Sequence, residues 1–191
     1  MKDILKQIEV ELQTRALDDE GIAQILSSYD PITQRRIIGG YASVSIVDRE
    51  GQRITIAALS EAVKRFMRES NYKNANVFHS NVTIGRVLPK WTNPETGETY
   101  KTKVDDTGWF CLVEIRDDVE LANKVWEEIQ RGTLRSFSIS GSSKKKSPVY
   151  DHGMMVDEVE ELDIFEVTIC EEPVNPMSKF DMLWNPNAIS I

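Results

Sequence analysis

The chain of 191 residues is 40% hydrophobic and 28% charged, which is typical of one ordinary globular domain with its own core. Its 31 acidic and 23 basic side chains give a formal net charge of -8, which repels a phosphate backbone and argues against nucleic acid as the main partner. The sequence has neither the long apolar run of a membrane helix nor a signal peptide, so we expect a cytoplasmic protein without a membrane partner.

The N-terminal part is predicted to be an arm, residues 1–30, made of two helices. One face of the first helix, over residues 3–15, collects the apolar side chains Ile4, Leu5, Ile8 and Leu12. A second, shorter helix is expected to end before Pro31. Amphipathy alone fits both an arm packed on the core and a docking segment for a partner.

The globular domain is predicted to span residues 31–185, with a tail at 186–191. Alternating apolar and small polar residues at 35–54, around the turn "DREG", predict a β-hairpin. Apolar side chains at helical spacing predict a helix in "LSEAVKRFMRESN", capped by Ser60 or the residue before it, and a second in "DDVELANKVWEEIQRG", ended by its glycine.

The remaining clear elements are strands, in "NANVFHS", "TIGRVLPKW", "GWFCLVEIR", "TLRSFSISGS" and "ELDIFEVTICEEPVNP". The polar segment 142–154 between the last two is predicted to be a mobile loop. Because most strands follow one another without a helix between them, we expect an α+β fold, a mostly antiparallel β-barrel decorated by helices.

The two cysteines, Cys111 and Cys170, lie inside apolar strand segments, where cysteine usually behaves as a small buried hydrophobic residue. A disulfide or a zinc site is therefore not expected. No other pattern in the sequence predicts a metal or a cofactor.

Nucleophilic catalysis needs a hydroxyl or thiol, a base and a group that orients the base. Histidine is the usual base, and the chain has two, His79 and His152. His79 ends a predicted strand, which holds a geometry better than the predicted loop around His152. For either histidine, a structural or surface role is the alternative.

Serines are crowded at residues 136–143. Strand alternation places Ser136, Ser138 and Ser140 on one face and the apolar Phe137 and Ile139 on the other. The serines are thus expected to point away from the core, and the period alone does not choose a nucleophile among them.

A carboxylate lies in the last apolar strand. Alternation predicts that Glu166 shares a face with Leu162, Ile164 and Thr168, and that both faces of the strand are buried. A buried carboxylate needs a partner, so Glu166 is either half of a structural ion pair or the orienting acid of a catalytic triad.

The segments "VFHSNVTIGRVL", "IQRGTLRSFSISG" and "LDIFEVTICEEPVNP", in this order, resemble the prohead maturation proteases of tailed bacteriophages. The resemblance covers roughly residues 36–178. It implies a fold like that of the herpesvirus assembly protease, with His79 as base, Ser138 as nucleophile and Glu166 as the acid, or Asp163 or Glu161 if the strand register slips. The departures from the family pattern are Ser80, Ser136, Ser140 and Val174.

The function implied by this resemblance is that of a serine endopeptidase of phage head maturation, acting inside the prohead in the host cytoplasm. Its substrates would be the scaffold protein, the major capsid protein and the protease itself, and it could form a homo-oligomer. Oxyanion donors are expected near Gly141 or in residues 144–153. The alternatives are a capsid component that keeps the protease fold without turnover and a β-rich binding domain unrelated to phage.

Overall fold

The computed structural model describes residues 35–68, 73–80 and 82–186. The predicted arm at residues 1–30 and nearly all of the predicted tail lie outside these residues. The chain divides into two compact units, and the fold described below is that of the unit Ile37–Trp184. The predicted domain boundaries therefore stay a prediction.

The described residues form eleven strands and two helices. In chain order they are β1 (Arg36–Val44), β2 (Gln52–Ile54), α3 (Ile56–Arg68), β3 (Asn74–Val77), β4 (Thr83–Leu88), β5 (Lys90–Thr92), β6 (Thr99–Lys101), β7 (Lys103–Val104), β8 (Gly108–Ile115), α4 (Glu120–Gln130), β9 (Ser136–Asp151), β10 (Met154–Cys170) and β11 (Phe180–Trp184).

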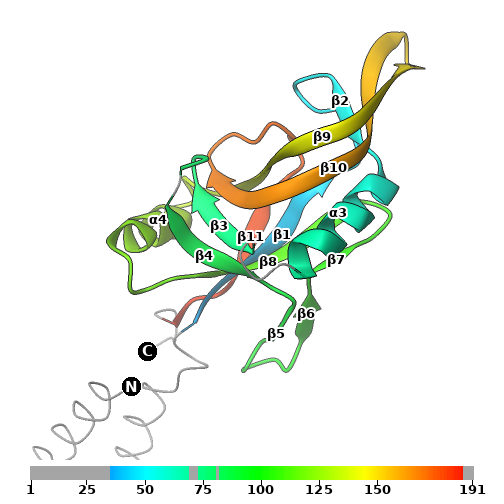
Figure 1. Cartoon of the computed structure of the whole chain (residues 1–191). Coiled ribbons are helices and arrows are strands. Elements are labelled where there is room, and N and C mark those ends of the chain that lie inside the picture. The colour runs from blue at the N-terminus through cyan, green and yellow to red at the C-terminus, as the bar shows by residue number, and fades with distance from the viewer. Residues whose placement is uncertain (1–34, 69–72, 81, 187–191) are drawn as a thin grey trace, which may run out of the picture. The chain divides into compact units, whose positions relative to one another are not determined.

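Nine of these strands form one sheet in the order β11-β1-β8-β4-β3-β10-β2, with β7 beside β8 and β9 beside β10 (Figure 1). β10 runs parallel to β2 and to β3, whereas β9 and β10, β3 and β4, β4 and β8, and β1 and β11 pair antiparallel. The predicted mixed and mostly antiparallel fold is thus confirmed.

The predicted barrel is wrong, because the sheet does not close. Closure needs a continuous ladder between the first and last strands. Among the described residues, the chain around the start of β9 meets β11 and the segment before it only at the isolated bridge between Ser136 and Lys179 and at two backbone hydrogen bonds, from Phe137 N to Ser178 O (3.0 Å) and from Phe180 N to Arg135 O (3.1 Å).

Both predicted helices are confirmed. α3 packs against β10 and β8 through the buried side chains Ala58, Leu59, Ala62, Val63 and Phe66. Its cap is Thr55, whose Oγ1 accepts a hydrogen bond from Ala58 N (3.1 Å), so the helix begins earlier than the predicted cap at Ser60. α4 ends at the predicted glycine, since Gly132 has a φ of +77°, which side chains with a Cβ adopt only at a cost.

The hairpin predicted at residues 35–54 is wrong. Its turn exists, since Gly51 N donates to Asp48 O (3.1 Å), but β1 and β2 do not pair with each other. Both edges of β1 are occupied, by β8 and β11, so β2 instead joins β10 in parallel register.

The predicted mobile loop at 142–154 is also wrong, because most of it belongs to the two strands of a long hairpin, β9 and β10. The connecting turn holds His152 and Gly153 at φ of 45° and 86°, the left-handed pair that suits a two-residue hairpin turn. The lysines that suggested a loop have cross-strand partners, since Lys144 pairs with Asp163 and Lys145 with Glu160. A polar sequence therefore folds as strand here because the partner strand supplies the opposite charges.

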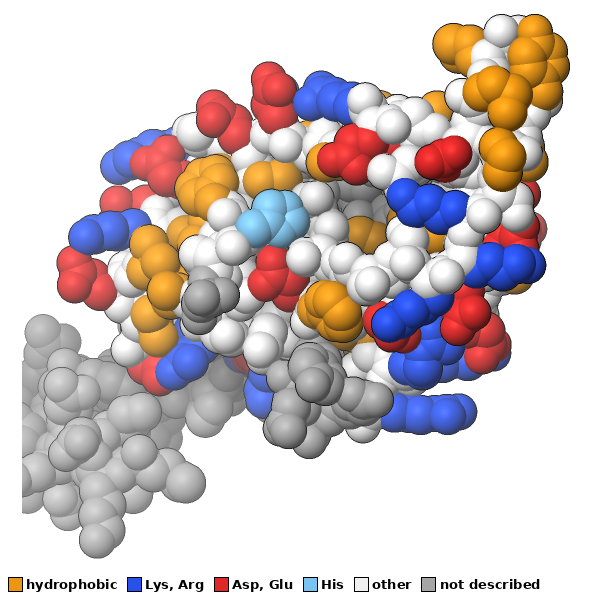
Figure 2. All heavy atoms as spheres, turned by 45° about the horizontal axis from the view of Figure 1, so that its top comes forward, with side chains coloured by type: hydrophobic (Ala, Val, Ile, Leu, Met, Phe, Trp, Pro, Cys, Tyr) orange, Lys and Arg blue, Asp and Glu red, His pale blue; other side chains and the backbone are white. Residues whose placement is uncertain are grey.

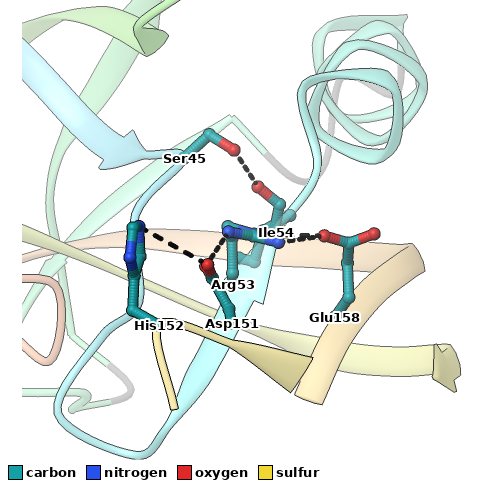
Figure 3. Close-up of polar contacts among 6 residues, drawn as sticks. All are labelled: Ser45, Arg53, Ile54, Asp151, His152 and Glu158. Atoms are coloured by element: carbon teal, nitrogen blue, oxygen red, sulfur yellow. Dashed lines mark hydrogen bonds and ion pairs between the residues drawn. The ribbon is translucent and has the colours of Figure 1, made fainter. Parts of the chain in front are cut away.

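The hairpin is tied to β2 by ion pairs that we call the outer cluster, made of Arg53, Asp151 and Glu158 (Figure 3). Arg53 donates to Asp151 at 2.6 Å and to Glu158 at 2.7 Å. Hydrogen bonding to Glu158 is the largest cause that raises the pKa of Arg53 above its ordinary value, followed among the raising causes by the bond to Asp151. The cluster thus joins a strand on one edge of β10 to the tip of the hairpin on its other edge.

The larger of two core clusters takes its side chains from the sheet and from both helices. It contains Trp109, Trp126, Phe137, Val167 and Ile169, all at most 2% exposed. Cys111 and Cys170 are buried and free, as the sequence predicts.

Candidate active site

His79 follows the end of β3 in an unusual turn. Phe78 and His79 have φ of 48° and 51°, a left-handed conformation that costs roughly 1–3 kcal/mol for residues other than glycine. Two backbone hydrogen bonds fix the turn, from Phe78 N to Ile169 O (3.1 Å) and from Ser80 N to Val77 O (2.9 Å). Strain of this kind, fixed by surrounding contacts, is typical of functional sites.

A β-bulge in β10 sets the face of the strand on which the Glu166 side chain lies. Ile164 lies opposite Gly141, and Glu166 lies opposite Ser140, so Phe165 is an extra residue without a partner in β9. Ile164 and Val167 are both in the core, at 5% and 0% exposure, although a spacing of three would place them on opposite faces of a regular strand. The bulge thus shifts the alternation, so that Glu166 shares the face of Thr168, as predicted, but not that of Ile164, with which alternation grouped it.

The carboxylate of Glu166 accepts hydrogen bonds from two strands and one turn. His79 Nδ1 lies 3.0 Å from Oε1, Thr168 Oγ1 donates to the same oxygen at 3.0 Å, and Asn76 Nδ2 donates to Oε2. The side chain of Glu166 is 15% exposed and that of His79 is 48% exposed. The carboxylate is therefore held at a fixed position beside a histidine ring that solvent still reaches.

Ser138 lies in line with Thr168 and Asn76 across three neighbouring strands. It lies opposite Thr168 across the β9–β10 ladder, and Thr168 lies opposite Asn76 across the β10–β3 ladder. Ser138 is only 7% exposed; the alternation predicted that it points away from the core, toward a groove or solvent, and it lines the cleft described below. Three neighbouring strands thus bring Ser138, Thr168 and Asn76 side by side.

A cleft of about 320 Å³ opens beside this row. Figure 2 shows a hollow next to a histidine side chain, with apolar side chains inside it and acidic side chains near its rim. Both His79 and Ser138 line the cleft, with the apolar side chains Ala42, Ile46, Ile54, Val159, Leu162 and Val174 and the carboxylates Asp48 and Glu50.

Among the hydrogen bonds of the described residues, none joins Ser138 to His79 directly. Because Nδ1 of His79 is engaged by Glu166, Nε2 is the nitrogen left for a hydroxyl in the cleft. Such contacts are often loose in a substrate-free site and tighten when substrate binds. The arrangement can therefore deprotonate a serine once the two side chains approach.

The other residues weighed from the sequence lie elsewhere. Asp163 pairs with Arg65 and Lys144, each at 3.2 Å, and Glu161 is exposed on the hairpin. His152 lies in the hairpin turn with its side chain 94% exposed. Glu166 is thus the carboxylate that contacts His79.

Ser136 and Ser140, the serines on either side of Ser138, differ in their surroundings. Ser136 is 1% exposed, and its Oγ donates to Glu171 O at 3.4 Å, so it is a buried structural residue. Ser140 lines the cleft beside Ser138. Gly141 also lines it, but a Cβ there would lie 2.1 Å from Asp163 O, so the close β9–β10 contact by itself requires this glycine.

Two residues of the site, Asn76 and Thr168, were missed by sequence reasoning. Alternation placed Thr168 on the face of Glu166 without giving it a role, whereas the proximity of Asn76 to Glu166 follows only from the parallel register of β3 and β10. No group of three or more metal-ligating side chains occurs among the described residues. Within the same residues, no helix has the length and apolar character needed to cross a membrane.

Comparison with known proteins assigns the chain to a family. Residues 25–185 of the 191 match the family described as Caudovirus prohead serine protease. No match was found among curated proteins. Since the match extends over far more than half of the sequence, the chain belongs to the prohead serine proteases of the caudoviruses, the tailed bacteriophages.

Proposed function

We propose that this protein is an active serine endopeptidase in which Ser138 is the nucleophile, His79 the general base and Glu166 the group that orients His79. The observation that carries the proposal is the hydrogen bond of His79 Nδ1 to Glu166 (3.0 Å) at the border of the cleft that Ser138 also lines. Membership of a serine protease family supports the reaction type.

In the proposed mechanism, Nε2 of His79 removes the proton from Ser138 Oγ as this oxygen attacks the carbonyl carbon of a peptide bond. Glu166 keeps the other ring proton on Nδ1 and stabilises the imidazolium. His79 then protonates the leaving amine as the C–N bond breaks, and an ester remains on Ser138. A water molecule, deprotonated by His79, hydrolyses this ester.

Backbone N–H groups must stabilise the oxyanion of the tetrahedral intermediate. Of the two regions expected to supply them, Gly141 lines the cleft, whereas the lining does not include residues 144–153. We therefore place the donors in the β9 backbone near Gly141.

The family also supports a role in head maturation, inside the prohead in the host cell. On this basis the substrates are the scaffold protein, the major capsid protein and the protease itself. Interior location fits these substrates, because the scaffold protein and the protease are enclosed by the immature shell and the major capsid protein forms its inner surface.

The test uses a fluorophosphonate probe, which forms a covalent bond only with an activated serine hydroxyl, together with cleavage of the scaffold and capsid proteins. The probe should label the wild-type chain on the peptide that contains Ser138. Ser138→Ala should abolish both labelling and cleavage, while Ser136→Ala and Ser140→Ala keep measurable cleavage. Persistent cleavage by Ser138→Ala would overturn the assignment.

A second candidate is a protease fold without turnover, favoured by the lack of a direct bond between Ser138 and His79 among the described contacts. In that case purified chain would neither react with the probe nor cleave the scaffold and capsid proteins over hours. Assembly of the head would still depend on its presence.

A further inference from the structure

The connection between β10 and β11, residues 171–179 (Figure 1), has no strand of its own, yet part of it is buried. Ser178 is 0% exposed, and Pro173 is buried as well. Buried backbone outside regular structure must find hydrogen-bond partners elsewhere in the molecule. The partners of this connection therefore show which parts of the fold it holds together.

One set of bonds joins the connection to the start of β9. Phe137 N donates to Ser178 O (3.0 Å), and Ser136 Oγ donates to Glu171 O (3.4 Å). Ser138 is the next residue of β9, and it pairs with β10. The backbone that leads to the proposed nucleophile is thus held by β10 on one side and by the connection on the other.

A second set of bonds joins the connection to β1. Asn175 Nδ2 donates to Val44 O (2.6 Å), and Ser178 Oγ donates to Ala42 O (3.1 Å). Ser178 therefore binds β1 through its side chain and β9 through its carbonyl oxygen. Because β1 is itself paired with both β8 and β11, it is a fixed reference for the strand that carries Ser138.

The connection also forms part of the cleft wall. Val174 and Asn175 line the cleft, and Arg49 N donates to Val174 O (3.1 Å). Arg49 lies between Asp48 and Glu50, which belong to the same lining. The connection is thus bonded both to β9 and to another segment of the lining, so a shift of the connection would change the distance between them.

Asn175 has two separable roles in the connection. Its Oδ1 accepts a hydrogen bond from Met177 N (3.3 Å), which shapes the local turn, as asparagine and aspartate side chains commonly do. Its Nδ2 fixes that turn to β1 at Val44 O. Aspartate could perform the first role but not the second, because an ionised carboxylate has no hydrogen to donate.

We propose that Asn175 is a positioning residue for Ser138. Its bond to Val44 O fixes the connection on β1, and the connection in turn holds the start of β9, so that Ser138 Oγ stays within reach of His79. Asn175 acts through the backbone of β9 and not by contact with the reacting groups. This role rests on the proposed function of Ser138.

The test uses Asn175→Asp in the full chain, which keeps the acceptor for Met177 N and loses the donor to Val44 O. A carboxylate oxygen would then face a carbonyl oxygen, so the connection should move away from β1. The rate constant for labelling of Ser138 by a small fluorophosphonate should fall at least about tenfold, because a misplacement of about 1 Å can cost about 10²-fold in rate. The kcat for a peptide substrate should fall as well.

The matched control is Asn93→Asp, in the turn between β5 and β6. Asn93 Oδ1 also accepts from the backbone N–H two residues on, that of Glu95 (2.9 Å), and Asn93 lies outside the cleft lining. Because aspartate can shape this turn equally well, Asn93→Asp should leave the labelling rate and kcat unchanged.

A second variant, Ser178→Ala, removes the bond to Ala42 O and keeps the backbone bond to β9. It should lower the labelling rate less than Asn175→Asp, by about fivefold. In combination the two changes should cost less than the product of the single losses, because both bonds hold the same connection. Ser178→Ala also decides the question by the same measure if Asn175→Asp does not fold.

Loss of stability is separated from loss of position by urea denaturation, which gives the native fraction of each variant in the assay buffer. The positioning role is refuted if Asn175→Asp labels at the wild-type rate per native molecule, if only KM changes, or if Asn93→Asp causes an equal loss. A wild-type chain that is neither labelled nor able to cleave would instead refute the proposed function, and the role of Asn175 with it.

Discussion

The β9–β10 hairpin carries a polar cluster at each end, and the two are built differently. The inner end is the one away from the hairpin turn, where Ser138 and Glu166 lie. There the carboxylate of Glu166 is 15% exposed and accepts hydrogen bonds from Asn76, Thr168 and His79. At the outer end, Arg53 is 28% exposed and shared by two carboxylates, Asp151 and Glu158, exposed to a similar degree. The inner cluster leaves one histidine ring accessible, whereas the outer one joins charged groups to each other.

Backbone geometry separates the two ends as well. The inner end has a bulge at Phe165 and a left-handed turn at Phe78 and His79, both of which direct side chains of the site. The turn at the outer end is a two-residue connection that uses Gly153, the residue such turns favour. The bulge and the turn at the inner end thus direct side chains of the site, whereas the left-handed turn at the outer end, at His152 and Gly153, connects β9 to β10.

The largest difference between the ends is expected from removal of their carboxylate charges. Glu166→Gln should lower kcat by about 10⁴-fold, because an amide no longer holds the His79 ring in the required tautomer. The matched variant Glu158→Gln should leave kcat within about twofold, since the outer cluster touches no reacting group. Steady-state cleavage of a peptide substrate measures both, and equal losses would contradict the division of roles.

A smaller effect is expected from the groups that hold Glu166. Asn76→Ala and Thr168→Val each remove one donor to the carboxylate and should lower kcat by up to about 10²-fold with KM little changed, as misplacement of a catalytic group does. The double variant should lose less than the product of the two single losses, because both act through the same carboxylate. A change confined to KM or to stability would mean that these residues have no positioning role.

The sequence predicts the parts of this fold that local signals specify. α3 and α4 follow from apolar residues at helical spacing, and Gly132 ends α4 where expected. The long hairpin does not follow, because the polar run around Lys144 and Lys145 becomes strand only through partners that are distant in sequence, Asp163 and Glu160.

The candidate site, like the fold, is predicted by the sequence only in part. His79, Ser138 and Glu166 come from the family resemblance, and their roles remain predictions. The bulge at Phe165 has no local signal, and it separates Glu166 from Ile164, which alternation placed on the same face. Asn76 becomes recognisable only once the parallel register of β3 and β10 is known.

At the outer end, the expected effect is on stability. Arg53→Met should lower the free energy of unfolding by about 1 kcal/mol, because two partly exposed carboxylates lose their shared partner. Since the folded state raises the pKa of Arg53, its contribution is complete below the unfolded pKa and is lost only as pH rises through the folded pKa, in strong alkali. Urea denaturation should therefore give the same loss throughout the neutral range.

The control for this prediction is Lys64→Met, which breaks an exposed pair with Glu61 on the surface of α3 and should cost less. Activity at moderate temperature should be unchanged in Arg53→Met. A loss of kcat comparable to that of Asn76→Ala would contradict the assignment of the outer cluster to stability.

The smallest effect is expected from the thiol near the inner end. Cys170 follows Glu166 on β10, and burial raises the pKa of its thiol to about 11. Because the thiolate is the reactive form, almost none is present at pH 8, and iodoacetamide should neither modify the native chain quickly nor reduce its activity. Cys111 is fully buried, and burial raises its pKa as well, so thiol titration should detect both cysteines only after denaturation. Rapid inhibition by iodoacetamide of the native enzyme would instead point to a thiol, rather than Ser138, as the reactive group at the inner end of the hairpin.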